Sequence, residues 1–168
     1  FAILGSVKET NGASIPLGNN TAFIDIYIER DLENGTITEE EAQELIDQFA
    51  IKLRMIRFLR DGDFNNYFLQ KSPIITETIG GEVGGKSLIT KTAYRLLNTL
   101  ENLGVSTIPN LSLLWSNNLP NNFKRYCTKV MMRHNVLQFI NGNNLNSNDY
   151  AVTGFSGVSR IGKQIDYY

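Results

Sequence analysis

The segment from Phe23 to Arg60 constrains the fold most strongly, because helix periodicity, capping and charge distribution agree along it. It predicts two helices joined by a tight turn at Asn34-Gly35, since both residue types tolerate positive φ. Thr38 and Glu41 predict a capping box at the start of the second helix. Apolar residues then recur at three- and four-residue spacing and predict a face that packs on a core: Ala42, Leu45, Ile46, Phe49, Leu53 and Ile56.

The composition predicts a soluble globular protein, cytoplasmic and without nucleic-acid or membrane partners. The 168 residues are 42% hydrophobic and 20% charged, which suits one ordinary core. A net charge of −1 argues against a surface built to neutralise phosphates. One cysteine excludes an intrachain disulfide, and no apolar run approaches the roughly 20 residues of a membrane span. The chain has no signal-peptide pattern and begins and ends inside patterned sequence, so we expect residues 1–168 to be a single internal section of a longer domain.

The rest of the sequence alternates between strand and helix patterns, which predicts an α/β fold. The expected strands are Pro73 to Ile79, Asn110 to Trp115 and Val136 to Ile140. The expected helices are Thr90 to Leu103 and Pro120 to His134. Pro16 to Asn20 has turn composition, and Ala151 to Tyr168 is compatible with loop or strand.

A glycine-rich stretch offers one functional hypothesis, a nucleotide-binding P-loop. Gly80 to Ser87 satisfies GxxxxGK[ST] between a predicted strand and a predicted helix. In such a loop, backbone N–H groups surround a phosphate and the lysine neutralises it. The polar strand before it and the later helix start near Thr90 favour an ordinary glycine turn with a solvated lysine.

No cluster of residues in the sequence predicts cysteine or metal chemistry by itself. Cys127 and His134 lie seven residues apart on one helix, about 10 Å along its axis, so they cannot hydrogen-bond directly. Cys127 falls on an apolar face and is expected in the core, whereas His134 is expected to meet the negative helix end. With one cysteine and one histidine, we expect no metal site of the His/Cys type.

Several long segments resemble the pyruvate formate-lyase family of glycyl radical enzymes, the formate C-acetyltransferases. The longest is IYIERDLENGTITEEEAQELIDQFAIKLRMIRFLR. The others follow in order: NGASIPLG, TIGG followed by KSLITKTAYRLLNTL, PNLSLLWSNNLPNNFKRY, NDYAV and GKQIDYY. The resemblance covers nearly the whole chain and implies a helix-rich section of the glycyl-radical-enzyme α/β barrel.

The resemblance also implies a chemistry for the family, which is anaerobic. Such enzymes convert pyruvate and coenzyme A to acetyl-CoA and formate. A glycyl radical passes its spin to an adjacent cysteine pair, after a separate radical-SAM activase has installed the radical. For this chain we expect no cofactor bound by the section itself. As partners we expect pyruvate and CoA, the activase, and either a second copy or a full-length homologue.

The site positions implied by the resemblance depart from the family pattern. The cysteine pair falls at Gly154 and Phe155, neither of which can form a thiyl radical or a thioester. No catalytic residue is therefore expected, and the family's radical glycine has no counterpart in these 168 residues. Residues implied to line the pyruvate pocket are Ala13, Phe68, Ile74 in place of a tryptophan, and Tyr168.

Three functional hypotheses follow. The first is a pyruvate formate-lyase-like protein that is catalytically incomplete as this chain. The second is a non-catalytic subunit or interaction module of a glycyl radical enzyme. The third, the P-loop-like nucleotide binder, is weakened because the family carries Gly-Gly followed by Gly-Arg-Thr at this loop.

Overall fold

Helices and strands alternate along the chain, as the sequence predicts. The computed structural model describes residues 15–55, 63, 75–83, 85–143, 150–153 and 157–160, the last two ranges as backbone only. The helices are α2 (Asn20–Glu33), α3 (Glu39–Met55), α5 (Lys91–Leu103) and α6 (Asn121–His134). The strands are β1 (Ile15–Gly18), β2 (Ile75–Gly80), β3 (Glu82–Val83), β4 (Lys86–Ser87), β5 (Asn110–Trp115), β6 (Leu137–Asn141), β7 (Tyr150–Thr153) and β8 (Gly157–Arg160).

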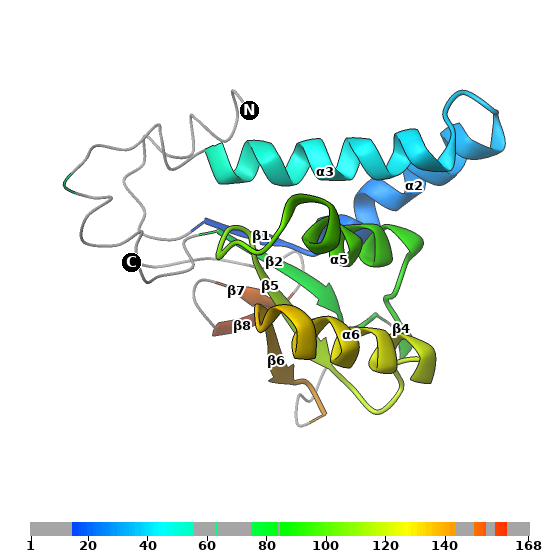
Figure 1. Ribbon diagram of the computed structural model, residues 1–168. Helices are drawn as coiled ribbons and strands as arrows, with labels where there is room; N and C mark the ends of the chain where they lie inside the picture. The colour runs from blue at the N-terminus through cyan, green and yellow to red at the C-terminus, as the bar shows by residue number, and fades with distance from the viewer. Residues whose placement is uncertain are drawn as a thin grey trace.

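A parallel sheet with helices on one side forms the centre of the molecule (Figure 1). Its strand order is β1-β2-β5-β6, and every adjacent pair is parallel. Helices α5 and α6 connect successive strands, as parallel pairing requires. Two antiparallel hairpins, β3-β4 and β7-β8, stand outside this sheet.

All four of these helices share one core with the sheet. The core joins Ile28 of α2, Ile46 of α3, Leu97 of α5 and Phe123 of α6 to strand residues such as Leu113. A second, smaller cluster joins the ends of β1, β2 and α3: Ile15, Ile75, Leu53 and Ile108. Leu111 and Leu113 of β5 and Leu137 of β6 therefore point toward the helices, whereas Leu114 lies on the opposite face of the sheet.

The helix pair at the start of the described region confirms most of the sequence prediction. The capping box forms, with Thr38 N donating to Glu41 Oε2 at 2.8 Å and Glu41 N donating to Thr38 Oγ1 at 3.2 Å. In the turn only Gly35 adopts positive φ, at 66°, while Asn34 is right-handed helical.

The predicted apolar face of α3 is wrong in one position and incomplete in another. Leu45 is 49% exposed, and Ala50, which was not assigned to the face, is buried. The cause is that α3 packs through a narrow stripe at positions 42, 46, 50 and 53, which leaves Leu45 at its edge. Ile56 lies outside the described residues.

Five further predicted elements agree with the structure to within one or two residues. They are the strands Ile75–Gly80, Asn110–Trp115 and Leu137–Asn141 and the helices Lys91–Leu103 and Asn121–His134. The region predicted as loop or strand contains the β7-β8 hairpin.

Strand β1 was not predicted, because Pro16 and the glycine and asparagines after it give the segment turn composition. Proline is tolerated there because β1 is an edge strand.

A buried arginine ties three helices together. Arg95 of α5 is 4% exposed and bonds Glu39 of α3 at 2.7 Å and Glu29 of α2 at 3.0 Å. Asp25 of α2 lies 3.6 Å from the same guanidinium. Hydrogen bonding to Glu39 raises the pKa of Arg95, and Arg95 holds the pKa of Glu39 below its ordinary value.

Candidate functional site

The sheet face that points away from the helices is polar. Successive strand residues point to opposite faces, and Ile79, Leu113 and Leu137 point into the helical core. The other face therefore carries the apolar Leu114 and Ile140 together with hydroxyl and amide side chains on three neighbouring strands: Thr76, Thr78, Asn110, Ser112 and Gln138. Parallel strands are usually apolar on both faces, so this composition distinguishes the face as a candidate binding surface.

Hydrogen bonds connect these polar side chains across β5 and β6. Asn110 Nδ2 donates to Ser112 Oγ and to Gln138 Oε1, both at 3.2 Å. Ser112 Oγ donates to Gln138 Oε1 at 3.2 Å, consistent with the direct register of these two residues. The arrangement is a neutral hydrogen-bonding surface that can bind polar groups but carries no charge of its own.

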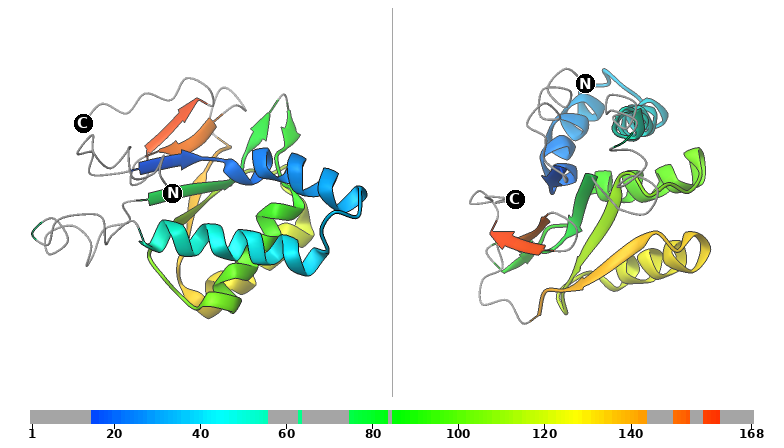
Figure 2. Two further views of the ribbon diagram at one scale, coloured as in Figure 1. Left: turned by 90° about the horizontal axis from the view of Figure 1, so that it is seen from above. Right: turned by 90° about the vertical axis from the view of Figure 1, so that its left-hand side faces the viewer.

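The β7-β8 hairpin lies on the polar side of the sheet. Figure 2 shows it across the sheet from α5 and α6, and β7 contacts β1, β2 and β5. Its two strands flank positions 154–156, which lie outside the described residues. Strand β7 therefore anchors the described part of the hairpin against the polar face.

Glu77 of β2 points the other way, toward the helices, and its role is to hold α2. Its Oε1 accepts from Asn20 N at 2.7 Å and Thr21 N at 3.3 Å, and its Oε2 accepts from Asn20 Nδ2 at 3.0 Å. The side chain has no exposed surface. Burial raises the pKa of Glu77 to about 8, although these hydrogen bonds oppose the rise. Sequence reasoning missed this residue, because nothing near Glu77 signals a contact 57 positions away.

Cys127 is a core residue, as predicted. It has no exposed surface, it packs in the same cluster as Phe123 and Val130, and burial raises the pKa of its thiol to about 12. A thiol in this environment stays protonated and inaccessible, so it cannot act as a nucleophile.

His134 lies in the last turn of α6, as expected, but the group it meets is a side chain. Its Nε2 lies 3.1 Å from Glu101 Oε1 of α5. Cys127 lies in the core and His134 lies beside Glu101, so the two side chains do not bond each other directly, as predicted.

The pyruvate formate lyase-like family model matches residues 1–165. The chain belongs to this family. The formate acetyltransferase of Haemophilus influenzae is 44% identical over 173 residues, a match that covers 100% of this chain and 22% of that protein. The section therefore spans about a fifth of the length of this relative.

Two solved structures show the same fold. A glycyl radical enzyme from Archaeoglobus fulgidus superposes with a TM-score of 0.69 at 18% identity, covering 89% of this chain and 21% of that one. A structure described for 1,2-propanediol dehydration in Roseburia inulinivorans superposes with a TM-score of 0.69 at 20% identity, covering 86% and 20%. The expected α/β section of a glycyl-radical-enzyme fold is confirmed.

The positions that the family resemblance implies for substrate and catalysis are not among the described residues. They are Ala13, Phe68, Ile74, Gly154, Phe155 and Tyr168. Ile74 immediately precedes β2, and Gly154 immediately follows β7, so both adjoin strands of this pyruvate formate lyase-like section. Their roles stay predictions.

The P-loop hypothesis is wrong in geometry. Lys86 and Ser87 form β4 of a hairpin paired with β3, whereas a P-loop places them in the first turn of the next helix. That helix, α5, begins only at Lys91, with Thr90 as its N-cap. Gly80 has a packing reason, since a Cβ there would lie 2.9 Å from the Leu114 carbonyl oxygen. Gly84 lies outside the described residues.

Neither a metal-binding cluster nor a membrane-spanning helix is present among the described residues. In that part of the chain no group of three or more histidine, cysteine, aspartate or glutamate side chains could hold a metal ion. The same residues contain no helix that is long and apolar enough to cross a membrane.

Proposed function

We propose that this chain is an internal section of the barrel wall of a pyruvate formate-lyase-like protein, and that it contributes no cysteine chemistry. The observation that carries the proposal is the position of the single cysteine, together with the residues at the family's cysteine positions. The only cysteine of the sequence is the buried Cys127, and the aligned cysteine positions hold Gly154 and Phe155. The family reaction, from pyruvate and CoA to acetyl-CoA and formate, needs an accessible thiyl and an acyl-carrying sulfur, and this section supplies neither.

The polar sheet face supports a role in forming the barrel interior. It carries neutral hydrogen-bonding groups on the side where the β7-β8 hairpin lies. We assign Ala13, Phe68, Ile74 and Tyr168 to the lining of the same interior, by family resemblance. Pyruvate, CoA, the glycyl radical and its activase belong to the family reaction, and a cytoplasmic location follows with them.

A chimera tests the proposal. The matching section of the Haemophilus formate acetyltransferase, 44% identical to this chain, is replaced by these residues. The chimera carries the glycine and phenylalanine and is expected to form no formate after anaerobic activation. A second chimera, with Gly154→Cys and Phe155→Cys, is expected to recover measurable formate production. Formate from the first chimera would refute the assignment, and so would a folded but inactive second chimera.

A non-catalytic subunit that docks on an intact homologue is the second candidate. It is favoured by exposed apolar side chains on α2, where Phe23 is 58% and Ile26 66% exposed. Co-purification with a full-length formate acetyltransferase, lost on Phe23→Ser with Ile26→Ser, is the expected result. A monodisperse protein that ignores such a partner would contradict this candidate.

A further inference from the structure

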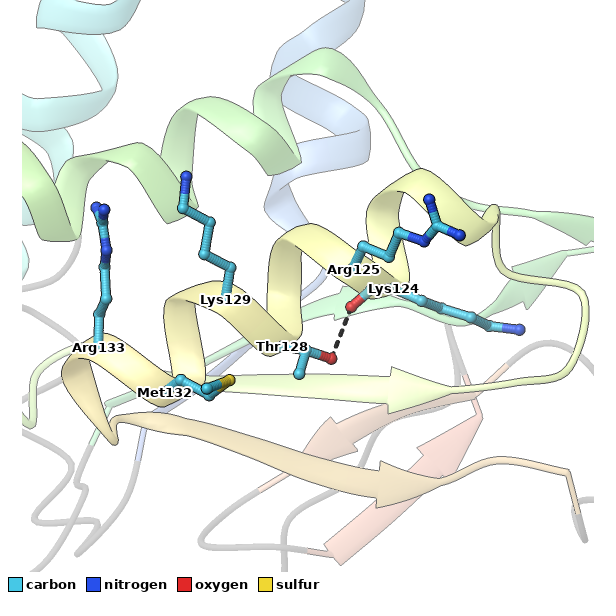
Figure 3. A pocket seen from close by; sticks show the side chains of 6 residues that line it. All are labelled: Lys124, Arg125, Thr128, Lys129, Met132 and Arg133. Atoms are coloured by element: carbon cyan, nitrogen blue, oxygen red, sulfur yellow. Dashed lines mark hydrogen bonds between the residues drawn. The ribbon is translucent and has the colours of Figure 1, made fainter.

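The outer face of α6 is a basic surface with an exposed methionine. The helix contains no acidic residue. Its outer side chains border a shallow hollow of about 600 Å³ (Figure 3). The lining residues, here called the basic surface, are Lys124, Arg125, Thr128, Lys129, Met132 and Arg133. Met132 is 83% exposed, more than any other large apolar side chain of the described residues.

Two cations of the basic surface make neither an ion pair nor a hydrogen bond within the described residues. Arg133 bonds Glu101 at 2.8 Å, and Lys124 donates to the Asn117 carbonyl oxygen at 2.8 Å. Arg125 and Lys129 make neither kind of contact there. They lie four residues apart, so their charges recur on one side of the helix about 6 Å apart along its axis.

The complementary surface lies on α3 of the same chain. Glu40 and Glu44 are exposed and share the four-residue spacing of Arg125 and Lys129. Leu45, which follows Glu44 on α3, is 49% exposed. Figure 1 places α5 between α3 and α6, so the two surfaces cannot meet within one molecule.

We propose that the basic surface of α6 docks the acidic face of α3 from a second copy of this chain. Arg125 and Lys129 face Glu40 and Glu44 of the other copy, and Met132 contributes apolar contact together with Leu45. The two surfaces have opposite charge at matched spacing, and this complementarity does not depend on the cysteine replacement.

The proposed contact joins two different surfaces, so it is head-to-tail. Each bound copy leaves one basic surface and one acidic face free, and assembly continues unless the rotation closes a ring. Because the pairs are exposed, salt weakens the contact: the Debye length is about 10 Å at 0.1 M ionic strength and about 3 Å at 1 M.

Charge-swapped variants test the proposal by sedimentation velocity. The first variant carries Arg125→Glu and Lys129→Glu, and the second carries Glu40→Lys and Glu44→Lys. The wild-type protein is expected to self-associate at low salt and to dissociate near 1 M NaCl. Each variant alone is expected to associate at least about tenfold more weakly, because attraction becomes repulsion. An equimolar mixture is expected to associate again, since acidic and basic surfaces then meet.

Lys86→Glu, a single charge reversal at an exposed position on β4, is the control for a charge change outside the two surfaces and should sediment like the wild type. A wild-type protein that stays monomeric at low salt over the whole accessible concentration range would overturn the proposal. Variants that associate as the wild type does, or a mixture that does not recover, would overturn it too. Far-UV circular dichroism of each variant confirms the fold, and these readouts are independent of formate production.

Discussion

Glu77 is the single residue whose environment departs most from that of its type. Its carboxyl group is fully buried, and it meets the first N–H groups of α2. Helix N-termini favour a negative charge, whereas burial disfavours it. Because burial dominates and raises the pKa to about 8, the native state binds the Glu77 proton more tightly than the unfolded chain does.

This gives a prediction for the pH dependence of stability. The raised pKa stabilises the fold below about pH 4.5, and the contribution is lost as pH rises toward 8. Between pH 5 and 8 the wild type should lose about 3 kcal/mol of unfolding free energy that Glu77→Gln does not lose. Urea denaturation of both proteins at the two pH values measures this difference. Parallel pH profiles would show that Glu77 is charged in the folded state.

Two glycines form a matched pair for testing close packing. Both have positive φ, 82° at Gly80 and 66° at Gly35, but only Gly80 faces crowded atoms. Gly35→Ala should cost about 1 kcal/mol from backbone conformation alone. Gly80→Ala should cost about 3 kcal/mol, because the methyl group would also push β2 from Leu114 on β5. Thermal and urea unfolding compare the two, and equal costs would contradict the close approach.

Within a single helix or strand, the local sequence pattern predicts which residues are buried. On α5, Ala93, Leu96, Leu97 and Leu100 repeat with the helical period, and all four are buried in the core. What the sequence could not indicate is which elements meet. Arg54 illustrates this: it lies in the last turn of α3, where a cation can complement its own helix end, but its guanidinium bonds the carbonyl oxygens of Leu103 and Gly104 at the end of α5.

Arg95 gives the prediction at this scale. Arg95→Met should destabilise the fold by about 2 kcal/mol, because it leaves Asp25, Glu29 and Glu39 close together without their shared cation. This expected loss of stability already allows for solvent screening, since Glu39 is 61% exposed. Arg133→Met, which removes a surface ion pair with Glu101, is the matched control and should change stability little. Urea denaturation in low salt compares them; similar losses would contradict the role of burial.

At the scale of the whole molecule, the sheet divides the structure into an apolar helical side and a polar side with the β7-β8 hairpin. The α/β class and most elements could be predicted from periodicity. The polar face could not, because Thr76 and Ser112 become neighbours of one surface only through strand pairing. The prediction about sulfur chemistry comes from the sequence alone, because it depends on the residue types at Gly154 and Phe155, which lie outside the described residues.

The most direct test of the central claim is exchange of labelled formate into pyruvate by the purified protein after anaerobic treatment with a radical-SAM activase. The Haemophilus formate acetyltransferase, treated in parallel, is the positive control. This account predicts no exchange above background for the chain, because its only thiol is the buried Cys127. Exchange above background that survives Cys127→Ala would contradict the account, since it would show that the family reaction proceeds here without either cysteine.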